Sequence, residues 1–199
     1  IEWGESQKTK KGARQTKEGV LFPQISTVQG RTLWYGVSDQ EPGDFLIPCL
    51  VRERYFVVQN NPQIRIGDMF FHGCFNNRSR VTLGSAVLNS TLTFFFLEFF
   101  GRINIGGRLY FDGNIVKPLL VPSVDEISSE KEDEIINAFS KLASRQILHI
   151  TEELKMGDRR KLDKLVLSSM GIKDENILNE IYTWMAKSVL RRLGKEKSL

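Results

Sequence analysis

Short apolar runs separated by turn residues fill residues 21–85 of the chain. Three of these runs are rich in β-branched and aromatic side chains: residues 45–47, 55–58 and 68–72. Gly, Pro, Asn and Asp residues bound the runs, which follow one another at intervals of about a dozen residues. This pattern predicts short strands that form a small, mostly antiparallel sheet.

The pattern changes to helical spacing at residues 85–100. Apolar side chains recur there at positions that share one helix face: Leu88, Leu92, Phe95, Phe96 and Phe99. Ser85 is the expected N-cap, and Gly101 is the expected stop. Because five phenylalanines lie within seven residues, we expect the helix to be buried on more than one side. Its polar residues Asn89 and Ser90 are expected to bond neighbouring backbone or to cap the adjacent loop.

A glycine-rich segment at residues 101–107 leads into another strand-like run at residues 109–111. From residue 128 onward the spacing of apolar residues predicts helices, two of which are expected to begin near Asp158 and Asp174. We therefore predict an α+β fold. It comprises a small, mostly antiparallel sheet with a buried helix, followed by a C-terminal helical segment.

These patterns divide the chain into three parts. Residues 1–20 are polar and cationic with almost no apolar pattern, which predicts a flexible arm or linker. Residues 21–127 are predicted to form the sheet domain, and residues 128–199 the helical segment. A chain of 199 residues has the length of one ordinary domain, with or without such an extension. Its start at Ile1, without a methionine, suggests a fragment of a longer protein.

The charge of the chain is modest, but its distribution is informative. The formal net charge is +4. Between residues 21 and 126, nine cations balance nine anions, and eight of the nine cations are arginine. The planar fork of donors on arginine suits phosphates and guanine edges better than the point charge of lysine does. This bias favours a nucleic-acid partner.

Two cysteines, Cys49 and Cys74, are too few for a disulfide framework, so we expect a reduced intracellular setting. No N-terminal signal segment is present, and the most apolar stretch, residues 92–100, is far too short to span a bilayer. The sequence therefore predicts a cytoplasmic protein without a membrane partner.

Polar loops supply the candidate DNA-binding residues. Asn and Arg can each pair bidentately with base edges, and cations beside glycines can neutralise phosphates that approach the backbone. The candidates are Arg31, Asn76, Asn77, Arg78, Arg80, Arg102, Asn104 and Arg108. Residues 76–80 are equally compatible with an ordinary solvent-exposed turn, and residues 101–108 with a plain helix-to-strand connection.

Other residues invite chemistry that the sequence supports less well. Trp34 and Tyr35 are able to stack on a base, although packing against a small sheet is the commoner role of such residues. His72 and Cys74 have a spacing suited to a metal, but a closed zinc site needs four ligands. Carboxylates between residues 39 and 53 invite a nuclease interpretation, which we discount because that stretch contains no lysine: Asp39, Glu41, Asp44 and Glu53. The cations at the end of the last helix are expected to complement its dipole, and a phosphate contact or docking onto another domain are the alternatives: Arg191, Arg192, Lys195 and Lys197.

Four groups of segments stand out by their order along residues 31–193. They are LWYG at 33–36 with FLIP at 45–48; RYFVVQNN at 54–61; VLNSTL at 87–92 with EFFGR at 98–102; and DRRKLD at 158–163 with MGI at 170–172, IY at 181–182 and VLRRL at 189–193. Together they resemble the C-terminal region of adenine-N⁶ DNA methyltransferases of type II and combined restriction–modification systems.

The resemblance implies a target-recognition domain that reads a sequence in double-stranded DNA for an N-terminal methyltransferase domain of the same protein. That absent domain would bind S-adenosylmethionine and the flipped adenine. This chain lacks the Asn/Asp-Pro-Pro-Tyr/Phe tetrapeptide of the family, to which residues 60–63 are the nearest string, and it lacks the glycine-rich cofactor loop. We therefore expect no catalytic, cofactor or metal residues here. The alternatives are a protein-interaction or scaffold module and a metal-dependent nuclease.

Overall fold

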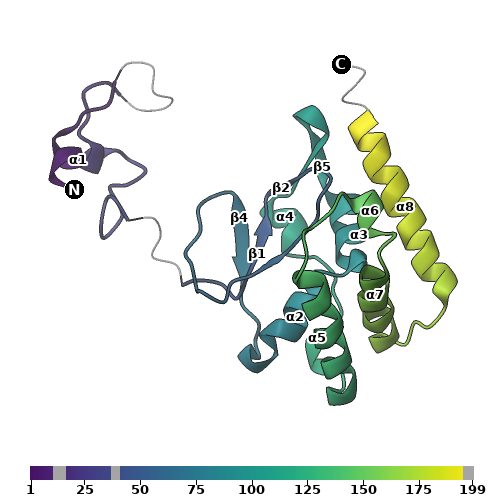
Figure 1. Ribbon diagram of the computed structural model, residues 1–199. Helices are drawn as coiled ribbons and strands as arrows, with labels where there is room; N and C mark the ends of the chain where they lie inside the picture. The colour runs from purple at the N-terminus through teal and green to yellow at the C-terminus, as the bar shows by residue number, and fades with distance from the viewer. Residues whose placement is uncertain (11–16, 37–40, 195–199) are drawn as a thin grey trace. The chain divides into compact units, whose positions relative to one another are not determined.

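The computed structural model describes residues 1–10, 17–36 and 41–194. Contacts within the chain group them into two units, Ile1–Glu41 and Pro42–Leu199. The second unit carries both sheets and all the longer helices (Figure 1).

The N-terminal unit contains two short helical elements: α1 (Glu2–Ser6) and the 3₁₀ turn η1 (Phe22–Gln24). An isolated antiparallel bridge joins Lys8 to Leu21. The described part of residues 1–20 is therefore grouped with the residues that follow it in one unit. Residues 11–16 of the predicted arm lie outside the described residues.

Trp34 organises this small unit. Its ring lies 6.5 Å from that of Phe22, centroid to centroid, and a Cβ atom on Gly4 would come within 2.7 Å of it. Trp34 thus has a packing role. Arg31 belongs to the same unit, where its Nη1 donates to the carbonyl oxygen of Gly36 over 2.6 Å.

The C-terminal unit contains two antiparallel sheets of three strands each. The first has the order β3-β1-β4, formed by β1 (Phe45–Pro48), β3 (Val58–Gln59) and β4 (Phe70–Gly73). The second has the order β2-β6-β5, formed by β2 (Leu50–Val51), β5 (Arg102–Asn104) and β6 (Arg108–Tyr110). Only Cys49 separates β1 from β2, so one extended segment supplies a strand to each sheet. The predicted antiparallel strands are confirmed, although they are divided between two sheets.

The predicted phenylalanine-rich helix is two helices, α2 (Val81–Leu88) and α3 (Thr91–Phe100). They meet at a bend of 66°. Asn89 stands at the bend, where its amide donates to the carbonyl of Val57 and its Oδ1 accepts from the N–H of the same residue. Ser90 caps α3 by accepting from the N–H of Thr93. The roles predicted for Asn89 and Ser90 are confirmed, whereas Ser85, the predicted N-cap, is buried within α2.

Among the described residues, no single helix combines the length and the apolar composition needed to cross a membrane. The bent pair formed by Arg78–Leu88 and Thr91–Phe100 meets that length and composition test only when its two helices are taken together.

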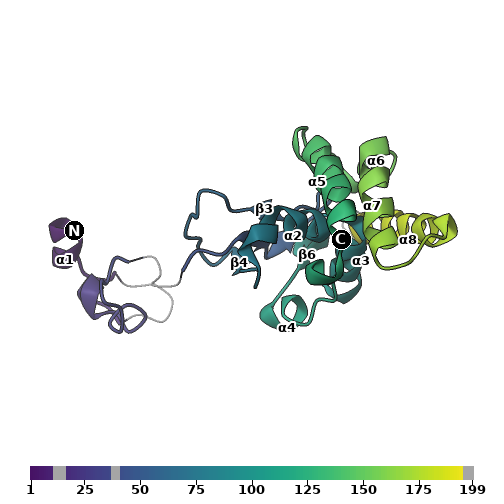
Figure 2. The ribbon, with the colours of Figure 1, turned by 90° about the horizontal axis from the view of Figure 1, so that it is seen from below.

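The remaining helical elements are η2 (Arg78–Arg80), η3 (Ile105–Gly107), α4 (Gly113–Val116), η4 (Val124–Glu126), α5 (Ser129–Ala143), α6 (Ile150–Glu153), α7 (Gly157–Ser169) and α8 (Glu175–Gly194). α5 and α7 pack side by side, and α5 also packs on α2 (Figures 1 and 2). α8 packs on α3. The helices after residue 128 therefore complete the core of the sheet-bearing unit, and the predicted domain boundary at residue 127 is not present.

The main core joins residues that are distant in the sequence. Ile47 from β1, Phe94 from α3 and Met185 from α8 are each at most 2% exposed and belong to one apolar cluster. Phe111, which follows β6, is fully buried in the same cluster. Because this core fixes both the β6 strand and helix α8, the hairpin formed by β5 and β6 is held on a rigid base.

Candidate nucleic-acid interface

The β5–β6 hairpin separates its side chains onto two faces. Arg102 pairs across the ladder with Tyr110, and Asn104 pairs with Arg108. Because side chains alternate along a strand, all four lie on the same face. Leu109 lies on the other face and is 1% exposed, in the core. We call Arg102, Asn104, Arg108 and Tyr110 the basic sheet face.

The cations of the basic sheet face stand in solvent. The Arg102 side chain is 66% exposed, and its Nη1 lies 3.1 Å from Oδ2 of Asp112. That carboxylate also caps α4, because its Oδ1 accepts from the N–H groups of Asn114 and Ile115. The side chain of Arg108 is exposed and has no hydrogen-bond or ion-pair partner among the described residues. An exposed ion pair such as that of Arg102 contributes little, so both guanidinium groups retain donors for a ligand.

Arg192 of α8 anchors this sheet from within. Its side chain is 1% exposed, and its Nε lies 3.1 Å from Oε1 of Glu98. It donates to the carbonyl oxygens of Gly107, just before β6, and of Arg52, just after β2. It also donates to the hydroxyl of Tyr55, which in turn donates to Glu98. One guanidinium therefore joins two strands of the sheet to helices α3 and α8.

The charge balance of this network favours its ionised form. Burial alone would lower the pKa of Arg192, but the hydrogen bonds and the negative charge of Glu98 hold it above its ordinary value. Burial and the same carboxylate raise the pKa of the Tyr55 hydroxyl far above its ordinary range. Tyr55 is consequently a neutral donor, and Arg192 and Glu98 are a buried ion pair. The position of Arg192 in the sequence predicts that it complements the helix dipole, but its main contacts are in the core.

The turn of the hairpin requires glycine. Gly107 has a φ of +64° and Gly106 a φ of +76°, both in the left-handed region that side chains with a Cβ rarely adopt. A Cβ atom on Gly107 would also lie 3.1 Å from the carbonyl oxygen of Arg192. The two glycines let the hairpin turn tightly against the end of α8.

The second predicted loop, residues 76–80, is used mainly by the fold. Asn77 caps η2 by accepting from the N–H of Ser79 over 3.1 Å. Arg80 donates to Glu132 over 2.7 Å and to the carbonyl oxygens of Val124 and Ile127. Its donors are therefore engaged within the fold, unlike those of an exposed arginine.

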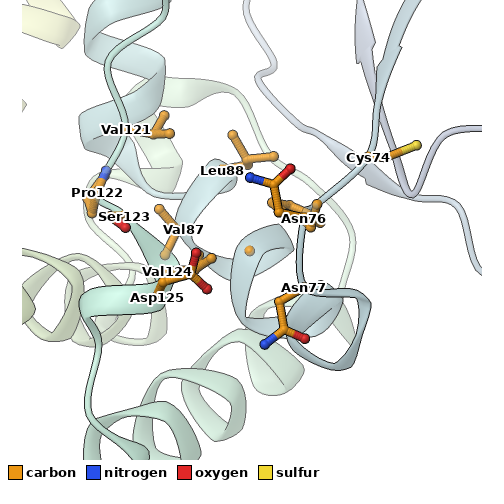
Figure 3. A pocket seen from close by; sticks show the side chains of 12 residues that line it. Cys74, Asn76, Asn77, Val87, Leu88, Val121, Pro122, Ser123, Val124 and Asp125 are labelled. Carbon is orange, nitrogen blue, oxygen red and sulfur yellow. The ribbon is translucent and has the colours of Figure 1, made fainter.

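Arg78 and the two asparagines of this loop remain accessible. Arg78 is exposed and has no partner among the described residues. Asn76 and Asn77 border a hollow of about 230 Å³ that is also lined by Val87 and Asp125 (Figure 3). Since an acidic side chain shares this hollow, it is a poor site for a phosphate.

The seven predicted DNA-contacting residues of the C-terminal unit do not converge on one surface. The eighth, Arg31, belongs to the N-terminal unit. Within the C-terminal unit, the start of α2 and the β5–β6 hairpin lie at opposite ends (Figure 1). The structure brings together Arg102, Asn104 and Arg108, and it adds Tyr110, which the sequence reasoning missed. The alternation of Arg108, Leu109 and Tyr110 was the signal that would have included it.

Residues 15–159 match the family model described as "Type II methyltransferase M.Eco57I, C-terminal domain". The chain belongs to this family. The match contains both sheets, the basic sheet face and the turn at residues 76–80. The predicted kinship with the C-terminal region of restriction–modification methyltransferases is thereby confirmed. Searches of curated proteins and of solved structures found no match.

Two segments of this methyltransferase C-terminal domain have sequences near to cofactor-binding motifs, residues 60–63 and residues 101–107. Neither has the structure that binding of S-adenosylmethionine would need. Residues 101–107 follow a helix and form one arm and the turn of a hairpin, whereas a cofactor loop follows a strand and opens a helix. Asn60 is buried, and its side chain is fully engaged with backbone groups of Gly43 and Ile64. No cofactor chemistry is assigned to either segment.

The described residues contain no cluster of side chains that would support a metal site or a metal-dependent nuclease site. In the part of the chain that the structure describes, no group of three or more His, Cys, Asp or Glu side chains is arranged to hold a metal. Asp44 is buried and accepts from the N–H of Phe75 over 2.9 Å. Asp39 lies outside the described residues. His72 is half-buried on β4, opposite Leu46.

Proposed function

We propose that the basic sheet face reads a sequence in duplex DNA as the target-recognition surface of an adenine-specific DNA methyltransferase. One observation carries the proposal. In a domain of the M.Eco57I C-terminal family, two arginines, an asparagine and a tyrosine share the solvent face of a rigid two-stranded hairpin. The major groove of B-DNA is wide enough to admit a two-stranded ribbon of this kind.

Each residue type on the face has a distinct part in such a contact. Arg102 and Arg108 would bind phosphates or guanine edges, which set the register of the protein on DNA and much of its affinity. Asn104 would donate from its free amide to an adenine or other base edge. A good bidentate pair with a base is worth about 1–3 kcal/mol of discrimination. In the free protein the Oδ1 of Asn104 accepts from the N–H of Ile105 over 2.7 Å, so a bidentate contact would exchange that bond.

The methyl transfer itself belongs, in this proposal, to a catalytic domain that works with this chain. That domain would bind S-adenosylmethionine and receive the target adenine after it leaves the base stack. The present chain would hold the duplex in register for it. A protein that acts on intracellular DNA works in the cytoplasm, which is the location we propose.

A binding titration of the wild-type chain with random-sequence duplex at two salt concentrations tests the proposal. For two phosphate contacts, one from each arginine of the face, the affinity should fall roughly 12-fold between about 50 mM and about 200 mM salt. Arg108→Gln should weaken binding and reduce the slope of log K against log salt by about 1. Arg78→Gln removes the same charge from an exposed arginine at the other end of the unit and should leave the slope unchanged.

Two outcomes of this titration count against the proposal. If the affinity does not change with salt concentration, or if no binding is seen, the phosphate contacts that the proposal requires are not formed. Equal losses in the two variants mean that only the net charge matters, and then the basic sheet face has no special role. Sequence reading is tested next by selecting bound duplexes from a random pool, in which the Asn104→Ala variant should lose preference at one base position.

A second candidate, docking of a protein, is favoured by an apolar patch beside the hairpin. Phe99 is 60% exposed and Ile103 is 57% exposed. With Trp184 they line a hollow of about 380 Å³ between α3, β5 and α8. Patches of this kind mark contacts with proteins. Binding of a separately produced catalytic domain that is lost in Phe99→Ser but retained at high salt would support this role.

A further inference from the structure

Ile105, at the tip of the β5–β6 hairpin, is the large apolar side chain that the fold exposes most. It is 90% exposed, ahead of Trp3 at 74% among the described residues. A scattered exposed apolar residue is ordinary on a protein surface. The position of Ile105 is what distinguishes it, because it lies at the turn between the strands that carry Arg102 and Arg108.

We propose that Ile105 is a wedge that enters the base stack of DNA when the arginines of the hairpin bind the flanking phosphates. The inference rests on the proposed function, which it deepens by assigning the step that opens the duplex. Minor-groove proteins that kink DNA insert Ile, Leu, Phe or Met between base steps and partly unstack them, and the tip of this hairpin would use the same step. An enzyme that modifies a base inside a duplex must first extrude that base.

The tip is built to hold its side chain in place. The N–H of Ile105 donates to Oδ1 of Asn104 over 2.7 Å. The next two residues, Gly106 and Gly107, turn the chain with φ values of +76° and +64°. The carbonyl oxygen of Gly107 accepts from the buried guanidinium of Arg192. The turn is therefore fixed at both ends, and one end is fixed to the core.

The side chain also suits the task. Isoleucine is branched at Cβ and is restricted in χ1, so it loses little rotamer freedom when it enters a confined space. The turn itself does not call for isoleucine, because the left-handed positions are occupied by the glycines. Cations stand in the adjoining strands, where an inserted tip would bring them toward the phosphates. No other described apolar residue that is more than 60% exposed lies between two arginine-bearing strands.

The experiment compares duplexes that differ only in the ease of unstacking. Fluorescence anisotropy measures binding of the full chain to a perfect duplex and to the same duplex with one central mismatch. Unstacking costs least at a mismatched base, so the wild type should bind the mismatched duplex roughly tenfold more tightly. Ile105→Ser should abolish this preference, and Ile105→Leu should retain it.

Ile64→Ser is the matched control, because Ile64 is 58% exposed and belongs to the loop between β3 and β4, not to the hairpin. It should keep the preference for the mismatch. Ile105 is so exposed that its substitution should leave the folded state intact, which a thermal melt of each variant verifies.

The possible results separate the two proposals. If the wild type binds duplex DNA with the expected salt dependence but shows no preference for the mismatch, the wedge is wrong and DNA binding stands. If Ile105→Ser and Ile64→Ser retain the preference equally, the wedge is also wrong. If the wild type binds neither duplex, the proposed function fails and the wedge fails with it.

Discussion

Arg108 lies in the β5–β6 hairpin and Arg192 anchors that hairpin from α8, yet the two arginines differ in solvent exposure and in hydrogen-bond partners. Arg192 is 2% exposed and directs its donors to Glu98, Tyr55 and two backbone carbonyl oxygens. Arg108 follows directly after one of those carbonyl groups, is exposed, and has no partner among the described residues. The first guanidinium is part of the scaffold, and the second is available to a ligand.

This difference has a simple electrostatic origin. A buried charge loses its hydration. It is therefore tolerated only where other groups of the protein accept its hydrogen bonds and balance its charge. Such a group has no donor left for a partner molecule. An exposed arginine keeps its hydration and can exchange water for a phosphate when the partner arrives. The hairpin combines both: a buried arginine fixes its position, and exposed arginines present its charge.

The same contrast recurs within the turn at residues 76–80. Arg80 is committed to Glu132 and to the backbone near η4. Arg78, two positions earlier, is exposed and unpaired among the described residues. Substitution of three arginines by methionine measures how much each stabilises the folded state. The expected loss in the free energy of unfolding decreases from Arg192 to Arg145 to Arg80.

The largest effect is expected for Arg192→Met. The substitution leaves Glu98 buried without its counter-charge, and breaking a buried pair in this way costs about 3–5 kcal/mol of the free energy of unfolding. Urea denaturation of the two proteins at neutral pH measures the difference. Arg191→Met is the control, because Arg191 is the exposed neighbour and its loss should cost less than about 0.5 kcal/mol.

A second variant keeps this prediction informative if Arg192→Met does not fold. Replacing both members, Arg192→Met with Glu98→Met, removes the uncompensated charge and should recover much of the lost stability, because apolar replacements of a buried pair are often neutral. A double variant that is less stable than Arg192→Met alone would contradict the role of the pair.

The elements of this fold were predictable because their signals are local. Strand segments near residues 45 and 70, and the helices after residue 128, follow from the spacing of apolar residues within short windows. Within β5, the two-residue period of a strand puts Arg102 and Asn104 on one face, and the register of the neighbouring β6 adds Arg108. Each inference needs only neighbouring residues.

Whether a given arginine is buried or exposed was not predictable, because it depends on partners that are far away in the sequence. Arg191 and Arg192 look alike in sequence, and the partner of Arg192 lies 94 residues away. The bend at Asn89 depends on the backbone of Val57, 32 residues earlier. One signal was present: Glu98 is the lone acid in an apolar helix, and a buried acid needs a cation.

An intermediate effect with a pH signature is expected for Arg145→Met. Arg145 joins Glu153 over 2.7 Å and Asp158 over 2.6 Å. Burial alone would raise the pKa of Glu153, but the hydrogen bonds from Arg145 and from the N–H of Leu148 bring it below its usual value. The hydrogen bond from Arg145 likewise lowers the pKa of Asp158. Loss of Arg145 should cost about 2–3 kcal/mol at pH 7.

The sign of the pH dependence follows from those lowered pKa values. The stabilisation is fully present above the unfolded carboxylate pKa values, near about 4, and is lost as the pH falls through the lower values of the folded state. The difference in the free energy of unfolding between wild type and Arg145→Met should therefore decrease as the pH falls from neutral to about 3. Lys155→Met disrupts an exposed pair with Glu152. Its free energy of unfolding should differ little from that of the wild type at both pH values. A difference for Arg145→Met that increases in acid would contradict this account.

The smallest effect in this series separates Arg80 from Arg78. Arg80→Met removes a half-buried pair with Glu132 and two bonds to backbone oxygens, which should lower the free energy of unfolding by about 1.5 kcal/mol. Arg78→Met should change it by less than about 0.5 kcal/mol, because an exposed arginine without partners contributes little to the folded state. Thermal melts of both variants, with the DNA titration repeated on each, provide the comparison. Equal stability of the two variants would mean that Arg80 is not committed to the fold, and it would return to the set of residues free to contact DNA.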